Sequence, residues 1–279
     1  MTRKWTTSAY SYAFQIILAL IVLLPIAFAL VSSFRPLDDI FKYLSPVTWK
    51  TFWPGNVTFE AYENLFALRG FGRTFFNTFF VSAVCVIFGL LVGSMAAFAF
   101  STFEFAGKKT AFAIVILTFM LPFEIIAIPL YSFVNRLGWI DSYSGLIIPN
   151  IANGLVIFLF YQFFQDMPKA LFESARIDGA SWFRVYSQIT MPLSKPVTVS
   201  AALLIFIQQW ESFLWPLIAV RSKAYKLIQV ALSDFVTDIM TYWNEMFAAV
   251  VLSIVVPVIL LLPLQRYYVE GIANTGSKE

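Results

Sequence analysis

The sequence predicts an all-α membrane protein with six transmembrane helices and a short charged helix between the fourth and fifth spans. Of its 279 residues, 59% are hydrophobic and only 13% are charged, and the mean hydropathy is +0.77. These values are far too apolar for a soluble globular domain. With no linker or low-complexity segment in the sequence, residues 1–279 are expected to form one membrane domain.

Six apolar stretches are long enough to cross a bilayer, because a helix that spans about 30 Å of hydrocarbon needs roughly 20 apolar residues. They cover about residues 12–33, 74–100, 110–134, 145–165, 197–220 and 246–268. Arg3 and Lys4 precede the first stretch, as in a secretory signal. Its apolar run is longer than a signal requires, so an uncleaved helix is expected.

The distribution of Lys and Arg predicts the orientation of the chain. The 19 basic residues are nearly balanced between the two sides. Arg3, Lys4 and the short 101–109 loop favour a cytoplasmic N-terminus. An even number of spans then places the C-terminus in the cytoplasm as well.

Prolines fall inside most of the predicted spans. They are Pro25, Pro122, Pro129, Pro149, Pro216, Pro257 and Pro263. A broken helix is tolerated in a bilayer only where neighbouring helices or a water-filled cavity satisfy the freed backbone groups. The pattern favours a moving, transport-type protein, with static kinks in a packed bundle as the alternative.

Several function classes are excluded by missing residue types. The sequence has no histidine and a single cysteine, Cys85, in an apolar run. His-based catalysis, an intrachain disulfide and thiolate metal clusters are thereby excluded, and we identify no catalytic or metal-binding residue in the sequence. The sequence contains no phosphate-binding loop for ATP, and residues 107–110 lack its first glycine. The scattered basic residues indicate no nucleic-acid binding.

Residues 166–192 form a charged segment within this apolar chain. Asp166 is expected to cap a first helix that Gly179 ends as its C′ residue. Ser181 is expected to cap a second helix, Trp182 to Thr190, that stops before Pro192. Lys169, Glu173 and Arg176 would share one face of the first helix. A solvated loop helix at the membrane interface is the plain alternative.

The spacing within this segment resembles the loop of binding-protein-dependent ABC importer permeases written E-A-A-x3-G-x9-I-x-L-P. The matching residues are Glu173, Ala175, Gly179, Ile189 and Pro192, with Ser174 in place of Ala and Met191 in place of Leu. Residues 129–131, 210–217 and 265–272 are similar to shorter runs of the maltose-type sugar importers. Glu211 stands where that family usually has Asn.

The resemblance implies that the segment is a coupling helix and that this chain is a non-catalytic permease subunit of a sugar importer. The expected ATPase-coupling residues are Glu173, Ser174, Ala175, Arg176, Asp178, Gly179, Ile189 and Pro192. The expected partners are a second permease subunit, an ATPase dimer that holds ATP and Mg²⁺, an extracytoplasmic sugar-binding protein and the lipid bilayer. No cofactor is expected in this chain, which would lie in a bacterial or archaeal inner membrane.

Polar residues inside the spans are the candidates for the translocation pathway. They are Glu124, Asn150, Asn153, Gln208, Gln209, Trp210 and Glu211. Such residues tend to face a bundle interior or a wet cavity. Hydrogen bonding between helices is an equally valid reading for each alone.

Two other functional classes compete with the permease subunit. In a stand-alone channel or ion-coupled carrier, Glu124 and Glu211 would couple ions. An intramembrane hydrolase is remote, because the sequence has no histidine and shows no convincing arrangement of other catalytic residues. The sequence does not indicate which sugar is carried, or whether the sugar is neutral or anionic.

Overall fold

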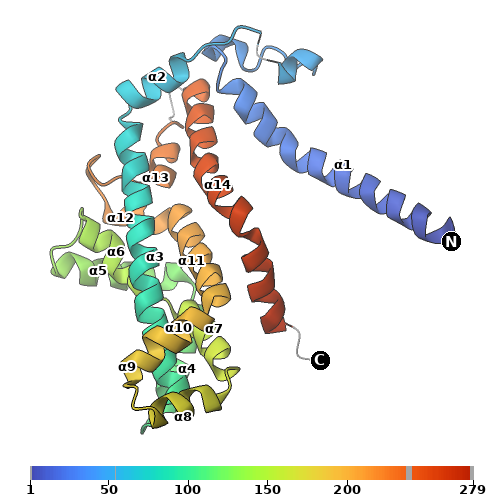
Figure 1. Ribbon diagram of the computed structural model, residues 1–279. Coiled ribbons are helices and arrows are strands. Elements are labelled where there is room, and N and C mark those ends of the chain that lie inside the picture. Colours follow the sequence, from blue (N-terminus) through green and yellow to red (C-terminus); the bar gives the residue numbers. More distant parts are fainter. Residues whose placement is uncertain (1, 54, 237–240, 277–279) are drawn as a thin grey trace. The chain divides into compact units, whose positions relative to one another are not determined.

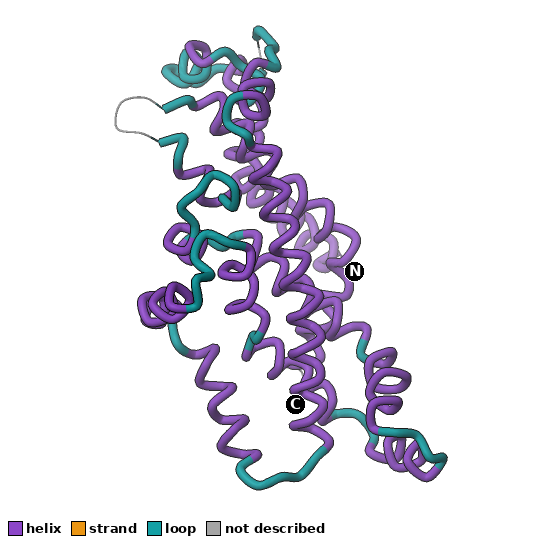
Figure 2. The backbone as a smooth tube through the Cα atoms, turned by 90° about the vertical axis from the view of Figure 1, so that its left-hand side faces the viewer, coloured by secondary structure: helices purple, strands orange, loops and turns teal. Residues whose placement is uncertain are grey.

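The computed structural model describes the backbone of residues 2–53, 55–236 and 241–276, and the side chains of residues 10–264 within those ranges. Over this part of the chain the structure consists of helices and loops without any strand (Figure 2). The prediction of an all-α membrane protein is confirmed. The chain divides into two compact units, residues 1–73 with 231–256 and residues 74–230 with 257–279. The expected single domain therefore stays a prediction.

The first unit contains α1 (Thr2–Ser32), α2 (Glu60–Ala67) and the start of α14 (Trp243–Gly276). From Tyr10 onward α1 is almost entirely apolar, and most of its side chains are exposed in this chain. Such a surface is stable only against lipid or another subunit. Near its end, the Phe28 ring meets Phe247 of α14 edge to face, with centroids 5.6 Å apart.

A buried arginine organises the loop between α1 and α2. Arg35 is 1% exposed, and its Nη2 donates to the carbonyl oxygens of Thr51 (3.2 Å), Trp53 (2.8 Å) and Lys50. These carbonyls lie at the 3-10 turn Trp49–Phe52, while a second 3-10 turn covers Leu37–Asp39. A guanidinium can bind several carbonyls at once because its donors point in a fixed fork. Arg35 therefore gathers a segment that has little regular structure of its own.

An ion pair joins the end of α2 to the start of α14. Arg69 Nε lies 2.7 Å from Glu245 Oε2, and the Glu245 side chain is only 6% exposed. The same guanidinium lies over the Tyr242 ring, 4.6 Å from its centroid. A buried carboxylate needs such a partner to remain charged.

The second unit contains most of the helices (Figure 1). They are α3 (Phe71–Thr102), α4 (Lys108–Met120), α5 (Phe123–Arg136), α6 (Tyr143–Ile151), α7 (Gly154–Gln165), α8 (Lys169–Ile177), α9 (Trp182–Arg184), α10 (Met191–Leu193), α11 (Lys195–Trp210), α12 (Leu214–Ala219) and α13 (Ile228–Ser233). The second unit begins within α3, at Thr74, and its first segment ends within α13, at Val230. Its core includes Val81 and Cys85 of α3, Val156 and Phe160 of α7, and Ile205 of α11. Cys85 is fully buried, as a small apolar side chain would be.

Four helical segments in the described chain are long and apolar enough to cross a membrane. They are residues 10–32, 71–102, 143–165 and 243–264, and the number rises to six if two bent helix pairs each count as one span. The first pair, α4 and α5, is bent by 104°, and the second, residues 182–193 with α11, by 81°. The described chain therefore contains helices suited to crossing a membrane, while the expected count of six spans stays a prediction.

Three of the expected spans are not continuous helices. The stretch 145–165 is divided between α6, which ends at Ile151, and α7, which begins at Gly154. The stretch 110–134 breaks at Leu121, whose backbone is extended, because a residue before proline is pushed out of the helical region. The stretch 197–220 ends its first helix at Trp210, and a new helix begins at Leu214. Pro216 explains this break, because in a continuous helix its ring would clash with the carbonyl four residues earlier. Pro25, Pro129, Pro149, Pro257 and Pro263 lie inside helices.

A carboxylate joins the loop between α5 and α6 to the residues after α12. Asp141 Oδ1 accepts hydrogen bonds from Arg221 N (3.0 Å), Ser222 N (2.9 Å) and Ser222 Oγ (2.9 Å). Asp141 N also donates to Ala219 O at 2.8 Å. These donors, with the Ser222 amide first, hold the pKa of Asp141 below its usual 3.8. The loop is thus locked by a group that must stay ionised.

We expect Asp141→Asn to lower the melting temperature of the protein at pH 7. A carboxylate with a lowered pKa stabilises the fold at pH values above its unfolded pKa, and this contribution disappears as the pH falls through the folded value. The melting difference between the variant and the natural protein should therefore vanish well below pH 3.8. Melting of both proteins in detergent between pH 7 and pH 3 measures this. A difference that is constant with pH would contradict the assignment.

Candidate functional site

The charged segment folds as a hairpin of helices, residues 168–193, called the hairpin below. Its first helix, α8, has Pro168 as N-cap, while Asp166 is the C-cap of α7. The expectation that Asp166 starts this helix is therefore wrong, because Asp166 still belongs to the end of the preceding helix. Gly179 is its C′ residue as expected, with φ +83°. Gly179 N donates to Arg176 O (3.1 Å) and Ala180 N to Ala175 O (2.9 Å), the Schellman pattern.

The second half of the hairpin begins at Ser181, as predicted, because Ser181 Oγ accepts from Arg184 N. It does not stop before Pro192 as expected. A π-helical turn, Val185–Thr190, follows α9 and leads into α10, which contains Pro192. The wider π-helical turn changes which carbonyl faces the proline ring and so lets the chain pass through this residue without a full break. The hairpin then continues into α11.

Arg176 ties the two arms of the hairpin together. Its Nη1 donates to Ala180 O at 2.6 Å, and its guanidinium lies over the Trp182 ring, 4.9 Å from the centroid. Trp182 in turn meets Phe103 edge to face at 5.1 Å. Cation–π and backbone contacts of this kind fix the angle between the arms.

The hairpin is also fixed to α3. Phe98 of α3 lies 5.4 Å from the Tyr186 ring and 6.3 Å from the Phe172 ring. The Tyr186 hydroxyl is 2.7 Å from Ser94 Oγ within the buried part of the bundle. Ala175 is buried here as well. These contacts make the hairpin a rigid extension of the helix bundle.

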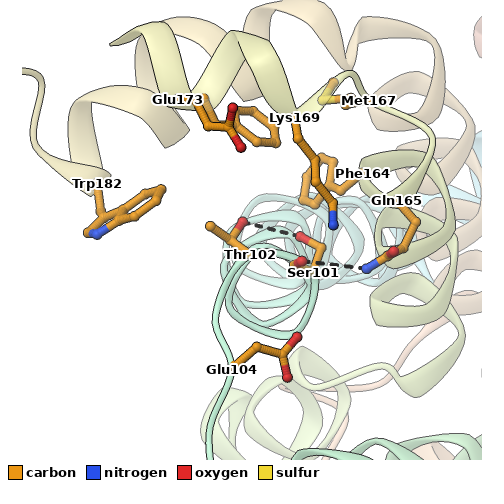
Figure 3. A pocket seen from close by; sticks show the side chains of 10 residues that line it. Ser101, Thr102, Glu104, Phe164, Gln165, Met167, Lys169, Glu173 and Trp182 are labelled. Atoms are coloured by element: carbon orange, nitrogen blue, oxygen red, sulfur yellow. Dashed lines mark hydrogen bonds between the residues drawn. The ribbon is translucent and has the colours of Figure 1, made fainter. Parts of the chain in front are cut away.

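A cavity of about 230 Å³, called the hairpin cavity below, lies between α8 and the end of α3. It is lined by Ser101, Thr102, Glu104, Phe164, Gln165, Met167, Lys169, Phe172, Glu173 and Trp182. Figure 3 shows Glu173 and Lys169 reaching from α8 towards Thr102 and Ser101. At its rim Glu104 pairs with Lys108 at 2.8 Å, and this hydrogen bond lowers the pKa of Glu104.

Glu173 is the exposed acid of the hairpin cavity that has no partner. Within the described residues it makes no hydrogen bond and no ion pair. Its carboxylate is therefore available to a cation or donor supplied by another chain. Glu173 also lines a second cavity of about 510 Å³, together with Phe172, Arg176, Ile177 and Trp182.

The remaining residues of the predicted coupling set have different environments. Ser174 is exposed and donates to Leu171 O at 3.2 Å, and Asp178 is the exposed C-cap of α8. Ile189 packs against the hydrophobic core, whereas Pro192 is exposed. The fold thus divides the motif into residues that shape the hairpin and residues that face outward.

A larger cavity of about 550 Å³, called the span cavity below, lies among α4 to α7 and α11. Three of the predicted pathway residues line it: Asn150, Asn153 and Gln208. Asn153 Nδ2 donates to Gln208 Oε1 at 2.8 Å, which joins the start of α7 to the end of α11. Asn150 Nδ2 donates to Leu146 O of its own helix at 2.8 Å. The cavity therefore combines three amides with apolar walls.

The other four pathway candidates do not line the span cavity. Gln209 and Trp210 are buried, and the Trp210 ring packs against Phe206 and Phe75 with centroids 5.3 and 5.8 Å away. Glu124 is exposed in the first turn of α5, and Glu211 is the exposed C-cap of α11. Trp210, the one aromatic residue among the predicted pathway residues, is thus held in the packed interior.

The span cavity also contains residues that sequence reasoning missed. Phe119 and Phe123 provide its aromatic walls, and Thr118 adds a hydroxyl. Thr118 lies four residues before Pro122, so a polar residue close to a proline break was the available signal. At the hairpin cavity the missed residues include Ser101, Thr102 and Trp182.

Interrupted apolar helices around a polar cavity, with a rigid hairpin at one end, are features of transport-type membrane proteins. Residues 89–274 match the family described as "Binding-protein-dependent transport system inner membrane component". The chain belongs to this family, as its charged loop had suggested. It is accordingly a membrane-embedded, non-catalytic permease subunit, and ATP is hydrolysed by a separate subunit.

Characterised relatives are similar over nearly the whole chain. The arabinooligosaccharides transport system permease protein AraQ of Halalkalibacterium halodurans is 30% identical over 94% of this chain and 93% of that protein. The sn-glycerol-3-phosphate transport system permease protein UgpE of Rhizobium meliloti is 33% identical over 92% of each.

A solved structure shares the fold. A chain of a bacterial ABC transporter involved in the import of the acidic polysaccharide alginate superposes with a TM-score of 0.83 and 22% identity, covering 96% of this chain and 98% of that one.

Proposed function

We propose that this chain forms half of the translocation pathway of an ATP-driven sugar importer and that a separate ATPase drives it through the hairpin. The observation that carries the proposal is Glu173, a carboxylate that lines two cavities of the surface hairpin and has no hydrogen-bond or ion-pair partner within the described residues. The carbohydrate class is supported by relatives named for arabinooligosaccharide transport and alginate import. The translocation pathway itself would run through the span cavity.

The coupling residues act in two ways. Glu173 and Asp178 are exposed and offer carboxylates to basic residues of the ATPase. Ser174, Ala175, Arg176, Gly179, Ile189 and Pro192 set the shape of the hairpin and its contact with the bundle. Neither group carries out chemistry on ATP.

The hairpin is connected covalently to the span cavity. α10 passes through Ser194 into α11, and Gln208 lies in the last turn of this 16-residue helix. Gln208 bonds to Asn153, which caps α7. A displacement of the hairpin would move α11 as a rigid rod and change the span cavity at its other end. This path links ATP-driven motion to the substrate.

The proposal defines partners and orientation. The second permease subunit would complete the pathway, an ATPase dimer would hold ATP and Mg²⁺, and an extracytoplasmic sugar-binding protein would deliver the substrate. A related alginate importer has been solved in complex with a periplasmic protein that holds an alginate pentasaccharide. Because the hairpin faces the ATPase, both termini would be cytoplasmic in an inner membrane.

Uptake by vesicles that contain the complete importer tests the proposal against a stand-alone channel or ion-coupled carrier. We expect an ATPase to co-purify with this chain. We also expect sugar uptake to require ATP on the side of the membrane where the hairpin lies. Uptake that persists without ATP and follows an imposed ion gradient would contradict the proposal. Glu124 and Glu211 would then be the residues to examine.

A further inference from the structure

Two amide residues of the span cavity, Asn153 and Gln208, lie far along their helices from the hairpin. α7 has 12 residues, so at about 1.5 Å per residue Asn153 lies about 18 Å from the hairpin end of its helix. Gln208 lies about 20 Å from the start of α11 by the same measure. Both distances are shorter than the hydrocarbon core of a bilayer, which is about 30 Å thick. Amides at this depth are stable only if protein or an aqueous path covers them.

The polar groups that the span cavity presents are all uncharged. Among the described residues lining it, the hydrogen-bonding side chains are Thr118, Asn150, Asn153 and Gln208, and none carries a charge. Glu124 is the nearest acid in sequence, but its neighbours Phe123 and Ile126 line the cavity and Glu124 does not. On a helix of 3.6 residues per turn, Glu124 points about 100° to 160° away from these two residues.

The helix ends beside the cavity are also neutralised by the chain itself. A free helix N-terminus attracts anions. At α7, however, Asn153 Oδ1 accepts from Leu155 N (3.0 Å) and Val156 N (3.3 Å). At α5 the first turn already carries the carboxylate of Glu124. Neither helix therefore offers an open, positively polarised end to a bound anion.

The amides still have capacity for a ligand. Each side-chain amide has two N–H donors and an oxygen with two lone pairs. The bonds at Asn150 and Gln208 use only part of this capacity. Phe119 and Phe123 supply apolar faces beside them. Amides and aromatic walls in one cavity suit a molecule with hydroxyl groups on its edges and C–H groups on its faces.

We infer that the span cavity is a binding site for an uncharged, polyhydroxylated substrate, such as a neutral sugar, and selects against carboxylate or phosphate derivatives. This inference rests on the proposed function and deepens it. The relatives leave the point open, because their names include a neutral oligosaccharide, a phosphate ester and an acidic polysaccharide. The absence of charged side chains among the described residues that line the span cavity favours the neutral substrate over the two anionic ones.

Uptake of a matched panel by the unmodified importer with its own binding protein tests the inference. The panel contains neutral arabinotriose and maltotriose, an alginate trisaccharide and sn-glycerol 3-phosphate. We expect ATP-dependent accumulation of a neutral sugar at least tenfold faster than of either anion. Faster uptake of an anion would overturn this inference while leaving the proposed function intact. No ATP-dependent uptake of any member would contradict the proposed function itself.

Variants of opposite charge at one position provide the second test. For a neutral substrate, Gln208→Glu and Gln208→Lys should each slow uptake of the transported sugar about tenfold, the factor that the loss of about 1.4 kcal/mol represents. For an anionic substrate the two charges would act in opposite directions. Effects of opposite sign, or no effect from either charge, would overturn the inference.

Two controls separate charge at the cavity from misfolding. Gln162 is an exposed amide of α7 that does not line the span cavity. Gln162→Glu and Gln162→Lys should leave uptake within twofold of the natural importer. Gln208→Asn keeps an uncharged amide at the cavity and should retain more uptake than either charged variant. Equal loss in Gln208→Asn and the charged variants would count against a role for charge.

Discussion

Replacing Glu173 by lysine will leave the protein in the membrane and abolish ATP-dependent uptake. Glu173 is exposed and unpaired within the described chain, so the substitution breaks no internal bond. It places a second cation beside Lys169, which lines the same cavity. A basic residue of the ATPase that pairs with Glu173 would then meet repulsion in place of attraction. Swapping the sign of one charge at an interface costs several kcal/mol, enough to prevent docking.

Three measurements make this result interpretable. The amount of variant in the membrane fraction reports folding, co-purification reports docking of the ATPase, and uptake reports coupling. Glu63 of α2 is also exposed, so Glu63→Lys is the matched control and should transport normally. Glu173→Gln removes the charge without reversing it and should fall between the natural protein and Glu173→Lys. Normal transport by Glu173→Lys would refute the coupling assignment.

Replacing Gly145 by alanine will destabilise the fold, because the added methyl group has no room. A Cβ at this position would lie 2.2 Å from Trp139 O and 3.1 Å from Trp139 C, both backbone atoms. Gly145 N also donates to Ser142 Oγ, and Gly145 O accepts from Trp215 Nε1 at 3.0 Å. Overpacking of this kind costs about 1–3 kcal/mol, and displacement of these hydrogen bonds adds to it.

Thermal melting and membrane yield measure the effect of Gly145→Ala. We expect a clearly lower melting temperature and less protein in the membrane. Gly72→Ala is the control, because its Cβ would meet Phe66 at an ordinary 3.5 Å. Alanine is also the better helix former, so this control should melt at or above the natural temperature. Unchanged melting of Gly145→Ala would show that the turn between Trp139 and Gly145 can relax.

Some features of the hairpin could be predicted from the spacing of its residues, and others could not. Gly179 ends α8 and Ser181 begins the next arm as expected, because each depends on a backbone or side-chain property of one residue. Asp166 and Pro192 were placed wrongly. Their roles depend on where the preceding helix ends and on a π-helical turn, and neither is visible in the residue itself.

The positions of the helix breaks were also only partly predictable from single residues. Pro122 interrupts its span, whereas Pro129 and Pro149 lie inside helices. All three lack the same N–H group and carry the same ring. Whether the backbone bends there depends on the packing available to the freed carbonyl groups, and neighbouring helices supply that packing.

Composition and spacing alone determined that this chain is an all-helical membrane protein with a hairpin typical of importer permeases. Hydrophobic burial in lipid depends on content and length, and the hairpin depends on residue intervals, both of which are written in the sequence. Only the tertiary structure decided which polar residues line a common cavity. Gln208 lines the span cavity and its neighbour Gln209 is buried away from it, because successive helical residues point about 100° apart and only packing selects the face.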